Sequence, residues 1–305
     1  MNVLDCIKQE IFYLDGGSGS YLQEQGWLKA GEFPEMLNLN HPEAIIAMHK
    51  AYYEAGSNAV CTNTFGANGL KFDGKDGRPS VEEVVTAAVN CAKKARETAT
   101  REQTQRFIAL DIGPLGRLLS PMGDLSFESA VELFAEVVRA GSAAGADFIL
   151  IETMNDSYET KAAVLAAKEN CNLPVFVSNV YDESEKLLSG TSPEAMVAML
   201  EGLGADVIGL NCSVGPDRML DILPRFLACA SVPVLVKPNA GLPHSENGRT
   251  VYDISEEKFA QIMKKIVEQG ASVVGGCCGT TPNFIKKLVD VTHGMPVHEI
   301  KQKKI

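Results

Sequence analysis

The sequence predicts an α/β fold, a single (β/α)8 TIM barrel, on three observations. Its 305 residues are 45% hydrophobic and can bury one large core, and such a barrel commonly takes about 250 residues. Eight short apolar runs, rich in β-branched and aromatic residues, alternate with segments of helical spacing. No change of composition marks a linker, so we expect one domain over residues 1–305.

The predicted strands follow one another along the whole chain. They cover residues 11–16, 59–65, 107–113, 148–153, 174–180, 207–213, 233–239 and 273–279. Between them, segments such as 80–100, 126–145 and 255–270 place apolar residues three or four positions apart, the spacing of a helix with one buried face. Ser126 and Ser192 stand where N-caps are expected, and glycines end several helices before the next strand.

The longest connections are expected after the first two strands. They contain residues 28–44, LKAGEFPEMLNLNHPEA, and residues 66–80, GANGLKFDGKDGRPS. In a barrel of this kind the connections that leave the C-terminal ends of the strands build the active face. Both segments are therefore interpreted as elaborated loops on that face.

Composition and charge exclude several classes of partner. The net charge is −11 and no cluster of Lys and Arg is present, which argues against a nucleic-acid-binding groove. No apolar run reaches the roughly 18 residues that cross a bilayer, and the start MNVLDCIKQE lacks the pattern of a secretory signal. We therefore expect a cytoplasmic protein with no membrane partner. In the reducing cytoplasm, eight cysteines favour core residues, metal ligands or catalytic thiols over disulfides.

Polar or thiol side chains come at the end of every predicted strand, and a glycine follows the first of them. In a barrel these ends meet at one mouth, where the chemistry of such proteins takes place. The residues are, in chain order, Asp15, Gly16, Asn63, Thr64, Asp111, Glu152, Asn179, Asn211, Cys212, Asn239, Cys277 and Cys278.

Three of these residues form a candidate metal site. Thiols from Cys212, Cys277 and Cys278 at one rim suit Zn(II), which prefers sulfur ligands in tetrahedral geometry, and three protein ligands leave a fourth position for substrate. Neighbouring side chains on a strand point to opposite faces, so the adjacent pair can share an ion only where the backbone bends, and flanking glycines permit that bend. The alternative is that they are small buried apolar residues, which is our interpretation of the other cysteines.

Several motifs together resemble a known family. LDGGSGSYLQEQG, TNTFGAN, ETM, GLNCSVGP, KPNAGLP and GGCCGTTP stand in the order and spacing of the homocysteine S-methyltransferase domain, from about Ile11 to about Leu288. That domain occurs at the front of cobalamin-dependent methionine synthase and in betaine-dependent enzymes. The resemblance implies a barrel in which Cys212, Cys277 and Cys278 hold zinc and homocysteine completes the coordination. It also implies that Asn239 can occupy the fourth position when substrate is absent.

The implied chemistry is methyl transfer to a thiol, because zinc lowers the pKa of a bound thiol and the thiolate is the nucleophile. Backbone N–H groups of the loop Gly16, Gly17 and Ser18 suit the carboxylate of homocysteine, and Glu152 with Asp15 suits its ammonium group. The alternative for Glu152 is a rim carboxylate paired with a neighbouring cation. Two further residues either line the pocket or tie loops together, Asn63 and Thr64.

The sequence is compatible with two classes of methyl donor. We expect methylcobalamin on a separate corrinoid protein acting in trans, since the chain ends soon after the eighth barrel unit. The alternative is a small onium donor, S-methylmethionine or a betaine, for which Trp27 is a candidate cage residue. A zinc barrel that methylates a different thiol, or binds a thiol without turnover, also fits these residues.

Overall fold

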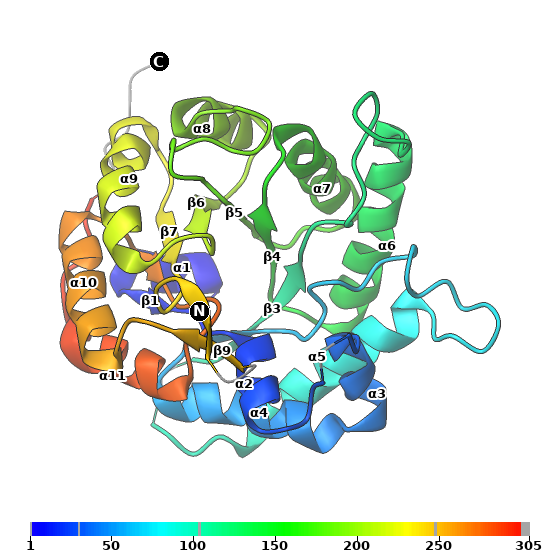
Figure 1. The fold of residues 1–305 in the computed structure, drawn as a ribbon, viewed down its shortest axis with the longest axis horizontal. Coiled ribbons are helices and arrows are strands. Elements are labelled where there is room, and N and C mark those ends of the chain that lie inside the picture. Colours follow the sequence, from blue (N-terminus) through cyan, green and yellow to red (C-terminus); the bar gives the residue numbers. More distant parts are fainter. Residues whose placement is uncertain (1, 30, 103–104, 247–248, 300–305) are drawn as a thin grey trace.

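A computed structural model describes residues 2–29, 31–102, 105–246 and 249–299 and confirms the barrel. Eight parallel strands form one sheet in the order β1-β10-β7-β6-β5-β4-β3-β2, and helices surround it (Figure 1). The strands are β1 Phe12–Tyr13, β2 Ala59–Cys61, β3 Phe107–Ile112, β4 Phe148–Met154, β5 Val175–Asn179, β6 Val207–Asn211, β7 Val234–Lys237 and β10 Val273–Val274.

The helices follow the strands as the spacing of apolar residues predicts. Ser126 and Ser192 do cap α6 and α8, because their side chains accept hydrogen bonds from backbone N–H groups in the first turn. The helical elements are α1 Val3–Gln9, α2 Ser18–Glu24, η1 Pro34–Met36, α3 Leu37–Asn40, α4 Pro42–Ala55, α5 Val81–Thr98, α6 Phe127–Ala144, α7 Ser157–Asn170, α8 Pro193–Gly202, α9 Pro216–Cys229, α10 Glu256–Gln269 and α11 Pro282–Thr292.

A side chain completes the barrel between β1 and β2. The Tyr13 N–H donates to Oδ1 of Asn58 at 2.8 Å, and the Asn58 N–H donates to the Tyr13 carbonyl at 2.7 Å. Asn58 is 4% exposed, so these groups have no access to bulk water. The side-chain amide of Asn58 therefore replaces the regular strand pairing between β1 and β2, whereas the other neighbouring strands are joined by backbone hydrogen bonds.

Replacing Asn58 with alanine is expected to lower the free energy of unfolding by about 1–3 kcal/mol, because it leaves the buried Tyr13 N–H without an acceptor. Asn90→Ala is the matched control, since Asn90 is exposed on α5 and its loss should change stability by less than about 0.5 kcal/mol. Urea unfolding of both variants measures the difference. Equal stabilities would show that Asn58 does not hold this seam.

Aromatic side chains fill the barrel interior near the N-terminal ends of the strands. Ring centroids of Phe12 and Phe107 lie 5.8 Å apart, and those of Phe148 and Phe176 lie 4.4 Å apart. The same buried cluster includes three side chains of α1: Val3, Cys6 and Ile7. Helix α1 therefore closes the N-terminal end of the barrel, and the open mouth is at the opposite end.

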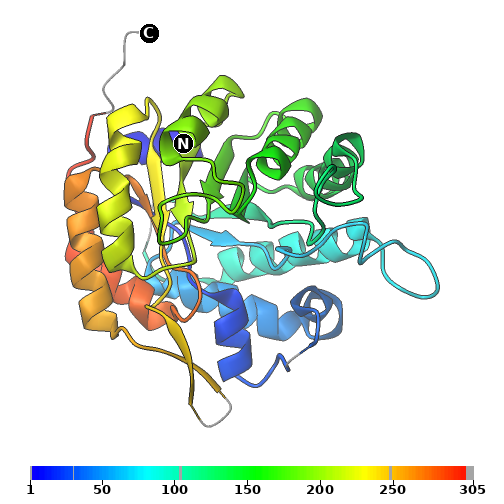
Figure 2. The same ribbon diagram turned by 45° about the horizontal axis from the view of Figure 1, so that its top comes forward.

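Three features differ from the expectations. Strands β1, β2 and β10 are much shorter than predicted. Strand β10 ends where the chain turns at Gly275 and Gly276, and the Gly276 N–H donates to the Asp15 carbonyl at 2.9 Å. Helix α1 and an antiparallel hairpin, β8 Pro243–Glu246 with β9 Arg249–Tyr252, are additional. The hairpin lies beside α2 in both views (Figures 1 and 2). Residues 300–305 of the predicted domain lie outside the described residues.

Over the ranges that the structure describes, no helix combines the length and apolar character that crossing a bilayer requires.

Candidate active site

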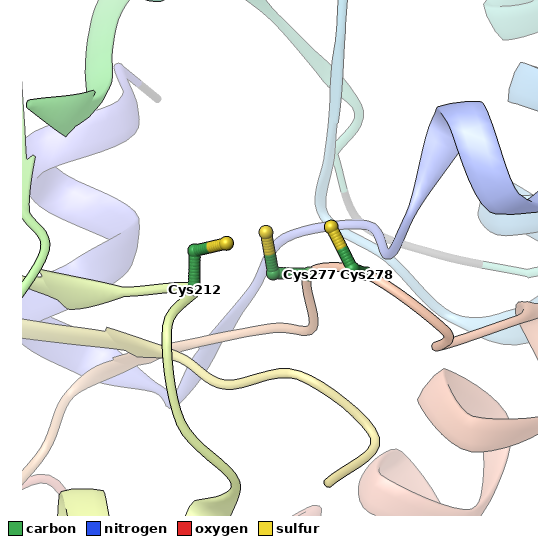
Figure 3. Close-up of side chains that lie close together, drawn as sticks. All are labelled: Cys212, Cys277 and Cys278. Carbon is green, nitrogen blue, oxygen red and sulfur yellow. The ribbon is translucent and has the colours of Figure 1, made fainter. Parts of the chain in front are cut away.

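The three predicted thiols do come together at the mouth of the barrel. The Sγ atoms of Cys212, Cys277 and Cys278 all lie within 4.8 Å of one another. Cys212 follows β6 and the other two follow β10, and their sulfur atoms point to the same side of the backbone (Figure 3). We call these residues the thiol cluster.

Strained backbone directs Cys212 into the cluster. Cys212 and Ser213 have φ values of 57° and 60°, a left-handed conformation that costs a residue other than glycine about 1–3 kcal/mol. The Cys212 N–H donates to the Lys237 carbonyl at 3.0 Å, which ties this turn to the end of β7. The chain thus leaves β6 sharply, and the thiol faces the mouth instead of a helix.

A second turn holds the adjacent cysteines. The Cys277 N–H donates to the Pro238 carbonyl at 2.8 Å, and the Cys277 carbonyl accepts from Oγ1 of Thr280 at 2.6 Å. Oδ1 of Asn239 accepts from the Cys278 N–H at 3.1 Å. The predicted fourth-position residue, Asn239, therefore supports the turn through its side-chain oxygen.

The glycine loop after β1 lies directly against this turn. The Gly17 N–H donates to the Thr280 carbonyl at 2.9 Å, so that donor of the predicted carboxylate loop already has an acceptor. A Cβ atom at Gly16 would lie 2.5 Å from the Thr280 carbonyl oxygen, and one at Gly17 would lie 2.7 Å from that of Cys277. Only glycine permits this approach. Ser18 begins α2, where the first N–H groups have no acceptor within the helix.

If the thiol cluster binds zinc, Gly17→Ala is expected to weaken that binding about 10- to 100-fold, because the new methyl group displaces the Cys277 carbonyl and with it the Cys277 thiol. Gly19→Ala is the control, since a Cβ there meets nothing within 4 Å. Competition with a chromophoric chelator measures both affinities. If the two variants bind zinc equally well, the close approach of this loop does not position the cluster.

The chemistry of the thiol cluster fits a metal cation. Hydrogen bonds with Cys277 and Cys278 lower the pKa of Cys212 to about 3, and the same interaction with Cys212 raises the pKa of Cys278 to about 11. The cluster therefore readily carries one negative charge, while ionising all three thiols requires a compensating cation. Two sulfur atoms that bind one zinc ion at about 2.3 Å each lie at most about 4.6 Å apart, so small side-chain movements suffice.

A second group of residues, the charged cluster, lies inside the mouth and consists of Asp15, Asp111, Glu152 and Lys237. Nζ of Lys237 lies 2.7 Å from Oε2 of Glu152 and 4.0 Å from Oδ1 of Asp15. Oδ2 of Asp15 accepts from the Cys61 N–H at 2.7 Å. Burial raises the pKa of Asp15 to about 6 and that of Asp111 well above its usual range, and neighbouring Glu152 raises the latter further.

Asn211 links the two clusters. Its Oδ1 accepts from the Thr153 N–H at 2.8 Å and from Oγ of Ser178 at 2.7 Å, and its Nδ2 donates to Oγ1 of Thr153. Thr153 follows Glu152 and has a left-handed φ of 62°, at a break in the register of β4. Because Asn211 precedes Cys212, one side chain positions both a thiol and a carboxylate.

Two predicted pocket residues join loops. Nδ2 of Asn63 donates to the Pro34 carbonyl at 2.8 Å and to Oδ1 of Asn38 at 3.1 Å. Oγ1 of Thr64 donates to the Asp111 carbonyl at 2.7 Å. These hydrogen bonds are those expected of the loop-tying alternative.

Three site residues were not singled out from the sequence: Ser178, Lys237 and Tyr252. Side chains alternate between the two faces of a strand, so Lys237, two residues after the buried Leu235, points to the same inner face. The sequence therefore contained a signal for the inward position of Lys237. Tyr252 gave no comparable signal, because it reaches the site from the additional hairpin. A Cβ at Gly279 would lie 2.3 Å from the Tyr252 ring, so this ring covers the cysteine turn.

Fold and site define the chain as a (β/α)8 barrel whose mouth gathers three thiols from two strand ends. A sequence model of the family Homocysteine S-methyltransferase matches residues 12–292. The chain belongs to this family.

Relatives and solved structures agree with that assignment. The chain is 31% identical to the methionine synthases of Mycobacterium leprae and Mycobacterium tuberculosis over 94% of its length, but it spans only 25% of theirs. The metallated form of the homocysteine methyltransferase MmuM from Escherichia coli matches it with a TM-score of 0.79 at 25% identity, covering 94% of this chain and 98% of that one. The oxidized form gives a TM-score of 0.80.

Proposed function

We propose that the chain is a zinc-dependent methyltransferase that converts homocysteine to methionine. The observation that carries the proposal is the thiol cluster, three sulfur atoms within 4.8 Å at the mouth of the barrel. Cys212, Cys277 and Cys278 would hold the ion, and Asn239, whose side-chain oxygen accepts from the Cys278 N–H, would supply the fourth ligand when substrate is absent. Zn(II) bound there would lower the pKa of an incoming thiol and leave it a nucleophilic thiolate at neutral pH.

The residues around the cluster suit the other end of homocysteine. Glu152 and Asp15 offer buried carboxylates to its ammonium group, and the loop from Gly16 to Ser18 offers backbone N–H groups to its carboxylate. Because the Gly17 N–H is bonded to Thr280, the first turn of α2 is the better part of this loop for the carboxylate. Asn63 and Thr64 would stabilise the loops around the mouth through their hydrogen bonds to neighbouring segments.

The transfer itself is a displacement at carbon. The sulfur of homocysteine donates an electron pair to the methyl carbon, and the bond from that carbon to the donor breaks with its pair going to the donor. A methyl group attached to cobalt, or to a positively charged sulfur or nitrogen, has such a leaving group. An ordinary ether or amine does not.

One feature of the connections at the C-terminal strand ends supports a macromolecular donor. Most exposed large apolar side chains lie on these connections or in the first turn of the next helix, the side of the barrel on which a docking protein would reach the mouth. Among the described residues, the exposed large apolar side chains in these positions are Trp27, Phe33, Leu39, Phe65, Leu70, Leu118, Met122, Tyr158, Leu188 and Leu242. Val291, the remaining one, lies on α11. We therefore propose a corrinoid protein, carrying methylcobalamin and acting in trans, as the donor in the cytoplasm.

The alternative is a small onium donor, S-methylmethionine or a betaine. Trp27, the residue considered for a cation cage, packs against His41 with ring centroids 5.4 Å apart and stays 40% exposed. That contact gives the indole a packing role, and its exposed ring surface leaves the onium alternative to be decided by the donor assay.

The test is a methyl-transfer assay with zinc-loaded protein, homocysteine and three donors in parallel: methylcobalamin, S-methylmethionine and glycine betaine. Methionine is quantified by mass spectrometry, and cysteine and cysteamine replace homocysteine in further reactions. Methionine from methylcobalamin alone is the expected result. Turnover with an onium donor would establish the alternative donor, and product from another thiol alone would overturn homocysteine as the substrate.

A further inference from the structure

The proposed chemistry leaves one buried cation without a role, the ammonium group of Lys237. Lys237 ends β7, is 2% exposed and ion-pairs with Glu152 on β4, a strand separated from β7 by β6 and β5. Its Nζ also lies 3.6 Å from Sγ of Cys61 on β2 and 4.0 Å from Asp15, which follows β1. One side chain therefore crosses the mouth and contacts residues from three other strands or strand ends.

The charges at this point do not balance. Three buried carboxyl groups, those of Asp15, Asp111 and Glu152, share one buried ammonium group, that of Lys237. Burial and the neighbouring Glu152 raise the pKa of Asp111 well above its usual range, which favours its protonated form. Even with Asp111 protonated, two carboxyl groups face one ammonium group in a region closed to bulk water. A carboxylate without a counterion there is costly unless a ligand supplies the missing cation.

Two buried carboxyl oxygens of the charged cluster have no hydrogen-bond partner among the described residues, Oδ1 of Asp15 and Oδ1 of Asp111. Oδ2 of the Asp15 carboxylate, in contrast, accepts from the Cys61 N–H. Lys237 lies closer to Glu152 than to Oδ1 of Asp15, at 2.7 Å against 4.0 Å. Oδ1 of Asp15 is therefore an available hydrogen-bond acceptor for a second ammonium group.

We propose that Lys237 is a positioning and specificity residue: it holds the Glu152 and Asp15 carboxylates in place with one negative charge in excess, so that only thiols that also carry an amino group bind well. The inference rests on the proposed function, because it assumes that homocysteine is the substrate. It adds that recognition of the amino group depends on a lysine that does not itself bind the substrate.

The experiment compares two thiols that differ only in the amino group, L-homocysteine and 4-mercaptobutanoate. Isothermal titration calorimetry measures their affinities for the zinc-loaded protein and for the variants Lys237→Met, Lys237→Gln and Lys237→Arg. Zinc content and circular dichroism check each variant, and the glutamine variant supplies the neutral comparison if the methionine variant does not fold. Steady-state assays with the active donor separate KM from kcat.

The wild-type protein is expected to prefer homocysteine by about 10-fold or more. The neutral variants should lower this preference to less than about 3-fold and raise KM with kcat nearly unchanged, while Lys237→Arg should keep most of the preference because it keeps the charge. Neutral variants that retain the full preference, or bind homocysteine more tightly, would overturn the role of Lys237 and leave the proposed function standing. A wild-type protein that binds neither thiol would overturn both.

Discussion

Cys277→Ser is expected to abolish stable zinc binding and to lower methyl transfer about 100-fold or more. A serine hydroxyl stays protonated where the cysteine becomes a thiolate ligand, and even the loss of one hydrogen bond that supports a metal ligand costs about 10- to 100-fold. Zinc per chain after dialysis, measured by atomic emission, should fall from about one to near zero. The fold should survive, because the thiol cluster lies beyond the strand ends and outside the buried core.

The control for this variant is Cys171→Ser. Cys171 follows α7, and its thiol donates to the Ala167 carbonyl at 3.4 Å, a contact that a serine hydroxyl can reproduce. Zinc content and activity should therefore equal those of the wild-type protein. The melting temperature of Cys277→Ser should match that of the zinc-free wild-type protein, and full zinc content in Cys277→Ser would refute the site.

The barrel and the thiol cluster were predictable because both follow from strong local patterns. Alternating strands and helices have periods that the sequence displays directly, and strand ends in a barrel meet at one rim whatever the loops do. Cys212 and the cysteine pair are far apart in the chain, yet that rule alone was enough to bring them together. The left-handed backbone at Cys212, which turns its thiol inward, had no signal of its own.

Lys237 shows a different limit of prediction from sequence, a signal that was present but not used. The residue stands in the KPNAGLP motif, which was used for the resemblance to a family, and its position two residues after the buried Leu235 was not used. Counting every second residue from the buried aromatic layer would have placed Cys61, Asp111, Glu152 and Lys237 on the inside. The sequence could therefore have predicted the inward position of Asp111, Glu152 and Lys237, although not that of Asp15, which is out of phase with the inward Phe12 and Leu14, nor which carboxylate pairs with the lysine.

The paths of the loops set the remaining limit on what could be predicted from the sequence. Whether Asn63 lines a pocket or joins loops depends on Pro34 and Asn38, residues in a connection whose path is determined by tertiary packing. The segment that forms the β8–β9 hairpin, PHSENGRTVY, does contain an Asn-Gly pair, which is typical of a two-residue hairpin turn, but this signal was not used. Its mainly polar flanking residues lack the alternation of apolar and polar side chains that would have strengthened the signal.

Glu152→Gln is expected to raise the KM for homocysteine about 10- to 100-fold with a much smaller change in kcat. A hydrogen bond to a charged group contributes about 1.5–3 kcal/mol, and each 1.4 kcal/mol is about a factor of ten. The substitution keeps the size of the side chain but removes the charge that would pair with the ammonium group. Steady-state kinetics over a wide range of homocysteine concentration measures the effect.

The same substitution also affects stability. It leaves Lys237 beside a neutral group, and removing one partner of a buried ion pair costs about 3–5 kcal/mol. Glu159→Gln is the control: Glu159 is a buried acid on α7 that accepts from the Leu115 N–H at 2.8 Å. A glutamine can keep that hydrogen bond, so both KM and stability should change little.

A double variant separates recognition of the substrate from folding. Glu152→Gln with Lys237→Met removes both charges of the pair and keeps side chains of similar volume, so the free energy of unfolding should return most of the way to that of the wild-type protein. KM should stay high, because the carboxylate that receives the ammonium group is still absent. If stability and KM recovered together, Glu152 would act on homocysteine only through the fold, and the ammonium group would have to bind elsewhere in the mouth.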